Sequence, residues 1–306
     1  MIDENDARDP SEGPAQSSPE NTGRRAAARE KARAAQARAR RRERTATLLV
    51  RGGVAVAALA IVTTLALVLV TSASAPIGPG PANAASDGVR VGPGFVVERS
   101  PAREADAEPV TSATPDASDV ADIAIYIDYH CPSCRQFELE NADYLSGLVE
   151  SGAATVQIHP LAITDSTSQG TRYATRAAAA AACVADLEPD RFWSVNRALF
   201  EAQPEGGSRG LDDDELTSVV TSAAELDDPA AVTACIADQR FAGWVAAATK
   251  RALSGPLPYD SVESITGTPT VLVNGSLYDA STQSFPEFVV SKLGSAYAAE
   301  TAGGAE

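Results

Sequence analysis

A cysteine pair separated by two residues constrains this chain of 306 residues more than any other feature. The motif Cys131-Pro132-Ser133-Cys134 directly follows a β-branched run over 123–128 and precedes a helix-period stretch in which Phe137, Tyr144 and Leu148 share one face. This order predicts a strand, a turn and a helix that begins at the first cysteine. We expect Cys131 at the N-cap and Pro132 at the first helical position, where its missing N–H would have had no partner.

A cysteine at a helix N-terminus loses its proton easily, because unpaired backbone amides and the helix dipole favour an anion there. A free thiol with a pKa near ~8.5 is only about 3% thiolate at pH 7, and lowering the pKa by ~2 units makes it mostly thiolate. Cys134 follows one turn later, close enough to attack a mixed disulfide formed at Cys131. The motif therefore favours dithiol chemistry, with both cysteines as catalytic residues.

A metal site is the main alternative for a C-x-x-C motif, because such a pair is also half of a zinc site. The remaining ligands would have to come from Cys183, Cys235, His130 and His159, and no second pair has the spacing of a zinc knuckle. We expect no metal and no cofactor. A copper or zinc carrier that uses the motif and one histidine stays the non-enzyme alternative, and an inert structural pair in a scaffold protein is a third.

Charge is distributed unevenly along the chain. Residues 1–51 carry a net charge of +4, and the remainder carries −20. An acidic main domain argues against nucleic-acid binding, which needs a basic surface. The polar residues 1–23 predict disorder, and the arginine-rich stretch 24–51 reads as a cytoplasmic anchor on anionic lipid rather than as a nucleic-acid arm.

An uncharged apolar stretch follows the basic segment and predicts a transmembrane helix over 52–73. A cleaved signal peptide is the alternative, since Ala73-Ser74-Ala75 resembles a cleavage site, but its leader would be unusually long. Either interpretation places everything after residue 75 outside the cytoplasm. Residues 74–90, rich in Pro, Gly and Ala, predict a linker between the span and the folded part.

The rest of the chain alternates between strand and helix signals. Pro and Gly mark the breaks, helical periodicity dominates 165–255, and Asn274-Gly275 is a strong hairpin turn. We expect strands at 95–97, 123–128, 155–159, 270–273 and 276–278, helices from Cys131 to Gly152, throughout 165–255 and over 286–297, and a frayed tail at 299–306.

This order of elements resembles that of the DsbA-like thiol–disulfide oxidoreductases, in particular the membrane-anchored Gram-positive and actinobacterial type. The matching stretches are 127–134, which ends in C-P-S-C, and Gly267-Thr268-Pro269-Thr270, which leads into a V-N-G hairpin. The resemblance covers about residues 90–298. It implies an α/β, thioredoxin-like fold, with a thioredoxin-like domain at 91–164 and 256–298 and a helical insertion at 165–255.

The resemblance also implies roles for individual residues. The Thr268-Pro269 bond should be cis and lie beside the cysteines, so that Thr268 can pair with an extended substrate as an added strand. The family's best-known oxidants have histidine between the cysteines, where this chain has Ser133. His130 could instead contact substrate and favour the thiolate, or simply point to solvent.

One further departure concerns a carboxylate. The buried acid that the family commonly has six residues before the first cysteine is Ile125 here. Asp128 either takes over proton transfer or merely ends its strand. We expect Pro132, Ser133 and Asp128 to tune the redox potential.

The second cysteine pair predicts a structural disulfide. Cys183 and Cys235 both fall on apolar faces of predicted helices, so pairing within each couple is favoured among the three pairings possible. Such a bridge would stabilise the fold by roughly 4 kcal/mol on the chain-entropy view and suits an extracytoplasmic location. Two buried free thiols are the alternative.

These inferences together predict a dithiol oxidase that introduces disulfides into exported proteins with free thiols. By resemblance, a quinone-linked membrane oxidase of the VKOR or DsbB kind would reoxidise it. A reductase or isomerase on the same scaffold is the alternative, because the reduction potential sets the direction.

Overall fold

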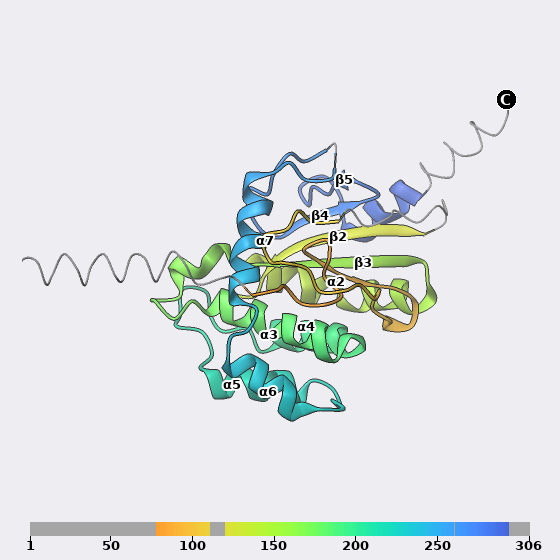
Figure 1. The fold of residues 1–306 in the computed structure, drawn as a ribbon. Coiled ribbons are helices and arrows are strands. Elements are labelled where there is room, and N and C mark those ends of the chain that lie inside the picture. Colours follow the sequence, from red (N-terminus) through yellow and green to blue (C-terminus); the bar gives the residue numbers. More distant parts are fainter. Residues whose placement is uncertain (1–77, 111–119, 260, 294–306) are drawn as a thin grey trace, which may run out of the picture. The chain divides into compact units, whose positions relative to one another are not determined.

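The computed structural model describes residues 78–110, 120–259 and 261–293 (Figure 1). The predicted basic segment 1–51, the span 52–73, the start of the linker and the tail 299–306 lie outside the described residues. Within the described ranges, no helix has the length and the apolar character needed to cross a bilayer. Membrane anchoring therefore stays a prediction.

A mixed sheet organises the described part of the chain. Its spatial order is β1-β3-β2-β4-β5, with β2 and β3 parallel and the other neighbours antiparallel. A parallel pair needs a crossover connection, and α2 (Pro132–Ser151) supplies it between β2 and β3. The strands are β1 (Val89–Val91), β2 (Ala121–Asp128), β3 (Ala154–Leu161), β4 (Thr270–Val273) and β5 (Ser276–Leu277).

Successive side chains of β2 enter two different layers. Ile123, Ile125 and Ile127 are fully buried in the main core, which they share with α2 and with the helix over 285–293. Tyr126 lies on the other face, in a smaller cluster with Ala252 of α7 (Ala242–Ser254). Because both faces are covered, β2 reads in sequence as a nearly continuous apolar run.

The chain between β3 and β4 is mainly helical, as its periodicity predicts. Figure 1 shows α3 to α6 gathered on one side of the sheet, with α7 running past the strands. The alanines of α3 are buried in the same core as the strands, so the helices and the sheet share one interior. The helices are α3 (Tyr173–Leu187), α4 (Phe192–Glu201), α5 (Asp213–Ser222), α6 (Pro229–Ala237) and α7, with short 3-10 turns η1 (Pro93–Phe95), η2 (Ile163–Thr167) and η3 (Pro189–Arg191).

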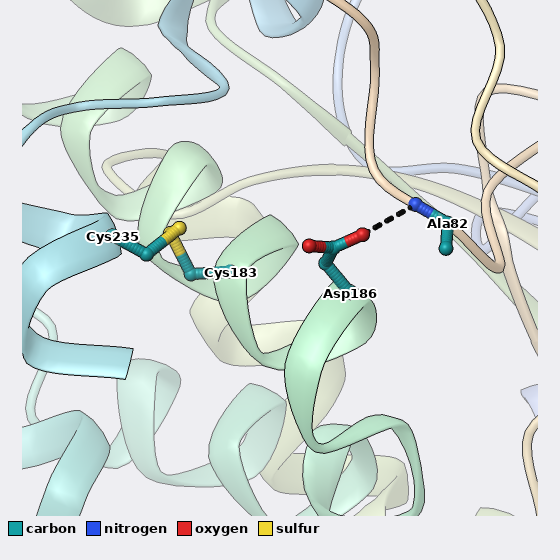
Figure 2. The surroundings of a disulfide bond; sticks show 4 residues. All are labelled: Ala82, Cys183, Asp186 and Cys235. Carbon is teal, nitrogen blue, oxygen red and sulfur yellow. Dashed lines mark hydrogen bonds between the residues drawn. A yellow bond between two sulfur atoms is a disulfide. The ribbon is translucent and has the colours of Figure 1, made fainter. Parts of the chain in front are cut away.

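A disulfide joins two of these helices. Cys183 on α3 is bonded to Cys235 on α6, which is the predicted pairing, and both residues are fully buried. Figure 2 shows Asp186, one turn after Cys183, accepting a hydrogen bond from the backbone amide of Ala82 at 2.8 Å. The bridge therefore lies next to the point where the chain's earlier residues reach α3.

Those earlier residues, 78–91, form what we call the N-terminal strap. Besides Ala82, the strap contributes Asn83, whose side chain donates to the Ala185 carbonyl, and Asp87, whose carboxylate forms two hydrogen bonds of 2.7 Å with Arg251 of α7. The described part of the predicted linker is thus packed against the fold and is not a free spacer.

One predicted strand is wrong. Residues 95–97 do not form a strand, because Pro93 and the left-handed Gly94 produce a 3-10 turn that ends at Phe95. The strand lies earlier, at Val89–Val91, and pairs with β3. Val97 makes only an isolated bridge to Val91.

Candidate active site

The cysteine motif lies where β2 ends and α2 begins. Cys131 is the N-cap residue, with extended backbone angles, and Pro132 is at the start of the helix, as predicted. The Cys131 carbonyl accepts from the amides of Cys134 and Arg135 at 3.1 and 3.2 Å, which forms the first helical turn. At the other end, the left-handed Gly152 terminates the helix.

Cys131 carries a free thiol, and 8% of the residue is exposed. A hydrogen bond from Cys134 lowers the pKa of the Cys131 thiol to about 6, with further help from Thr268 and from the amides of Cys134 and Ser133. Partial burial acts in the opposite direction. The Sγ lies 3.2 Å from the Thr268 carbonyl oxygen.

Cys134 has the opposite character. It is fully buried, and burial together with the neighbouring Cys131 raises the pKa of its thiol far above the usual range. Its sulfur accepts a hydrogen bond of 3.4 Å from the backbone amide of Asp128. At neutral pH the reduced pair therefore holds one thiolate, at Cys131, and one thiol, at Cys134.

Thr268 and Pro269 reach the site from far along the chain. The bond between them is cis, as the resemblance implied, and Thr268 contacts the Cys131 sulfur across 137 positions of sequence. Both residues are half-buried and directly precede β4. The structure thus brings the two predicted halves of the site together.

Asp128 is more than the end of a strand. Its carboxylate is fully buried and accepts three hydrogen bonds of 2.8 Å, from the His130 amide and from the amide and hydroxyl of Thr164. Burial raises the pKa of this carboxyl even so. Asp128 thereby fixes the turn before Cys131 to the segment that follows β3.

His130 does not point to solvent. Only 1% of the residue is exposed, and its ring meets the edge of Tyr173 on α3 at a centroid distance of 5.3 Å. Among the described residues, neither ring nitrogen has a hydrogen-bond partner, and the Tyr173 hydroxyl has none either. The predicted contact with substrate would thus have to come through the groove that His130 helps to line.

That groove, with a volume of about 870 Å³, runs beside the first turn of α2. Pro132 of the motif is exposed and lines it, while Ser133 is exposed outside it. The opposite wall belongs to the connection between α4 and α5. The lining comprises His130, Pro132, Arg135, Gln136, Leu139, Glu140, Thr164, Thr167 and residues 203–207.

Sequence reasoning missed a buried polar chain one turn beyond Cys134. Glu138 is buried on α2 and accepts a hydrogen bond of 3.3 Å from Asn196, which in turn accepts one of 2.8 Å from the Tyr129 hydroxyl. Burial raises the pKa of the Glu138 carboxyl to about 7. Its i+4 spacing from Cys134 on the buried face of the helix was the available signal.

Among the described residues, no group of three or more His, Cys, Asp or Glu side chains lies close enough together to hold a metal ion. His159, one of the candidate ligands, is buried against the Tyr126 ring at 4.2 Å, and burial lowers the pKa of its imidazole to about 3. It is not among the residues that line the groove beside Cys131.

Comparisons with known proteins find similar solved structures. The reduced disulfide bond oxidoreductase DsbG from Mycobacterium tuberculosis is 29% identical and has a TM-score of 0.50, over 68% of this chain and 86% of that one. Oxidised DsbA from the same organism is 28% identical, with a TM-score of 0.49 and coverage of 67% and 90%. MdbA from Actinomyces oris is 21% identical, with a TM-score of 0.45 and coverage of 55% and 77%.

Among curated proteins, no match was found. A family model described as Thioredoxin matches residues 113–289, which is more than half of the chain and includes both the cysteine motif and the Thr268-Pro269 segment. The chain therefore belongs to the thioredoxin family.

Proposed function

We propose that this chain is a thiol–disulfide oxidoreductase that works as a dithiol oxidase on exported proteins outside the cytoplasm. The observation that carries the proposal is the contrast within the motif. A thiol with a pKa of about 6 sits at the helix N-cap, and its neighbour is buried and stays protonated. That is the division of roles that disulfide exchange requires.

In the oxidative direction the enzyme begins with a Cys131–Cys134 disulfide. A substrate thiolate attacks the Cys131 sulfur, the bond to Cys134 breaks, and Cys134 leaves and takes up a proton because its pKa is high. A second substrate thiolate then attacks the substrate sulfur of the mixed disulfide and expels Cys131 as a thiolate. The substrate has lost two electrons, and the enzyme has become a dithiol.

The low pKa of Cys131 favours this direction for two reasons. A less basic thiolate is a better leaving group in the second step. In addition, a thiol with a pKa of about 6 is about 90% ionised at pH 7, which lowers the free energy of the reduced enzyme by about 1.4 kcal/mol, or ~30 mV for a two-electron couple. Stabilising the reduced form makes the oxidised form a stronger oxidant.

The proposed location rests on two features of the chain. The Cys183–Cys235 bridge suits an oxidising compartment, and the basic segment followed by the apolar stretch 52–73 suits an N-terminal anchor with the folded domain outside. A quinone-linked membrane oxidase of the VKOR or DsbB kind regenerates the disulfide in this proposal. The resemblance to DsbA-like proteins of Gram-positive and actinobacterial type motivates this choice of reoxidising partner.

The proposal is tested by trapping. In a Cys134→Ser variant the resolving thiol is absent, so we expect covalent adducts between Cys131 and exported proteins, visible as bands that disappear on reduction. Cys131→Ser is the matched control and should give none. A complete lack of adducts in Cys134→Ser cells would refute the exchange chemistry.

Whether the enzyme oxidises or reduces its substrates is tested by measuring the reduction potential of the full-length protein against glutathione. We expect a value well above the roughly −270 mV of thioredoxin. A potential at or below that value would make the chain a reductase on the same scaffold.

A further inference from the structure

A glutamine outside the motif contacts the active-site turn. Gln203 lies just after α4, in the connection to α5, and is half-buried. Its side-chain amide donates to two backbone carbonyls, that of Tyr129 at 2.8 Å and that of Cys131 at 3.0 Å. One side chain from the helical region therefore holds two carbonyls of the turn that carries the reactive cysteine.

The two carbonyls flank His130, so Gln203 fixes the backbone on both sides of that residue. The Cys131 carbonyl also accepts from Cys134 and Arg135 in the first turn of α2. The side chain of Cys131 itself makes no capping hydrogen bond to the helix. The orientation of the N-cap residue thus depends on what holds its backbone.

Two residues near Gln203 make further contacts with the start of α2. The Phe200 carbonyl, at the end of α4, accepts a hydrogen bond of 3.1 Å from the Arg135 side chain. Gly206 packs so closely on Pro132 that an added Cβ would lie 2.6 Å from the proline Cγ. The end of α4 and the α4–α5 connection together contact residues 129, 131, 132 and 135, at the turn and the start of α2.

We propose that Gln203 is a positioning residue for the exchange reaction, because its two hydrogen bonds hold the backbone of Cys131, and with it the sulfur, in place at the N-terminus of α2. This inference rests on the proposed function of the cysteine pair. Gln203 touches neither sulfur, and its effect passes through the backbone of residues 129–131. Losing one net hydrogen bond of about 1 kcal/mol from that backbone corresponds to a factor of about five in the equilibrium that it supports.

The test compares Gln203, a residue of the α4–α5 connection, with Gln169, which donates a hydrogen bond to that connection. Gln203→Leu removes the bonds to the turn. Gln169→Leu is the matched control, since Gln169 donates a comparable bond of 2.9 Å to the Gly207 carbonyl and does not contact the turn. The full-length reduced protein is alkylated with iodoacetamide across pH 4 to 9, and modification of Cys131 is followed by peptide mass.

For Gln203→Leu we expect the alkylation midpoint to rise by about half a unit to one unit, with alkylation at pH 5 about fivefold slower than in the unaltered protein. Gln169→Leu should leave the midpoint unchanged. If Gln203→Leu does not fold, Gln203→Glu keeps the size but replaces the donor with an acceptor. We expect its midpoint to rise at least as far. An unchanged midpoint, or an equal rise in the Gln169→Leu control, would overturn the proposal.

This result can be separated from the test of the proposed function, because alkylation needs no protein substrate. Adducts in Cys134→Ser cells together with an unchanged midpoint in Gln203→Leu would remove the role of Gln203 and leave the exchange chemistry intact. A raised midpoint without adducts would retain the positioning role and refute the exchange function.

Discussion

The four cysteines form two pairs in opposite surroundings. Cys131 and Cys134 are free thiols at the start of α2, next to backbone amides and to Thr268. Cys183 and Cys235 are bonded to each other and fully buried between α3 and α6. Polar donors make a sulfur ionise and react, whereas an apolar interior keeps it inert. Environment, more than spacing alone, separates an exchangeable pair from a permanent link.

Removing the buried bridge is expected to have the largest effect on stability. For the double variant Cys183→Ala/Cys235→Ala, we expect the free energy of unfolding to fall by about 3 kcal/mol, because the unfolded chain is no longer constrained. The Cys131 alkylation midpoint should stay near 6, since neither bridge cysteine is among the groups that shift the pKa of Cys131. Denaturant unfolding and alkylation measure the two quantities. A shifted Cys131 alkylation midpoint would show that the buried bridge influences the active-site thiol and that the two pairs are not independent.

A second test of this difference is the pH dependence of the stability of the reduced protein. The pKa of Cys131 is about 6 when folded and ~8.5 when unfolded, so its ionisation stabilises the reduced protein at high pH, and this gain is lost as the pH falls through 6. Relative to the oxidised form, which has no such thiol, the reduced form should gain roughly 2.5 kcal/mol between pH 5 and pH 8.

Denaturant unfolding of both redox forms at the two pH values gives that difference directly. Contributions from other titrating groups that are unaffected by the redox state cancel in the subtraction. A reduced-minus-oxidised difference that does not change with pH would mean that the Cys131 thiol titrates as it does in an unfolded chain.

A comparable effect of opposite sign is expected at Glu138, which lies one turn beyond Cys134. Burial raises the pKa of its carboxyl to about 7, so the unfolded chain ionises first and stability decreases as the pH rises from ~4.3 to 7. Glu138→Gln keeps the acceptor for Asn196 and removes this decrease. We expect the variant to be about 3 kcal/mol more stable than the unaltered protein at pH 8 and similar to it at pH 4.

Unfolding free energies at the two pH values check this prediction, with Glu140→Gln on the exposed face of α2 as the matched control. A variant that is less stable than the unaltered protein at pH 8 would show that Glu138 is an ionised partner of the polar chain rather than a buried neutral acid.

Local signals in the sequence predicted most of what local forces determine. Asn274 and Gly275 both have positive φ angles, 47° and 71°, as a two-residue hairpin turn requires. Asp212 and Glu215 form the reciprocal capping bonds that an acidic helix start favours. The cysteine motif was placed correctly because a proline after an N-cap residue has few other positions to occupy.

Contacts between segments that are distant in the chain could not be predicted from local sequence signals. Gln203 lies 72 residues from Cys131, in a connection without periodicity, and nothing near it in sequence identifies its partners. Val89 and Val91 flank a charged residue, Arg90, which hid the true edge strand, while the more apolar stretch over 95–97 suggested a false one. Arg90 forms ion pairs with Glu98 and with Asp122 on β2, and the pair with Asp122 exists only in the folded sheet.

The N-terminal strap is bonded to two helices, α3 and α7, ahead of the first strand. Ala82 is bonded to Asp186, and Asp87 is bonded to Arg251. A force applied to the backbone at Gly78 would therefore act on these bonds before it acts on the sheet. Asp186 lies on the disulfide-bearing helix α3, far along the chain from the turn at 129–131. Tension on the strap would thus pass to α3 and α7 through these bonds before it reaches β1.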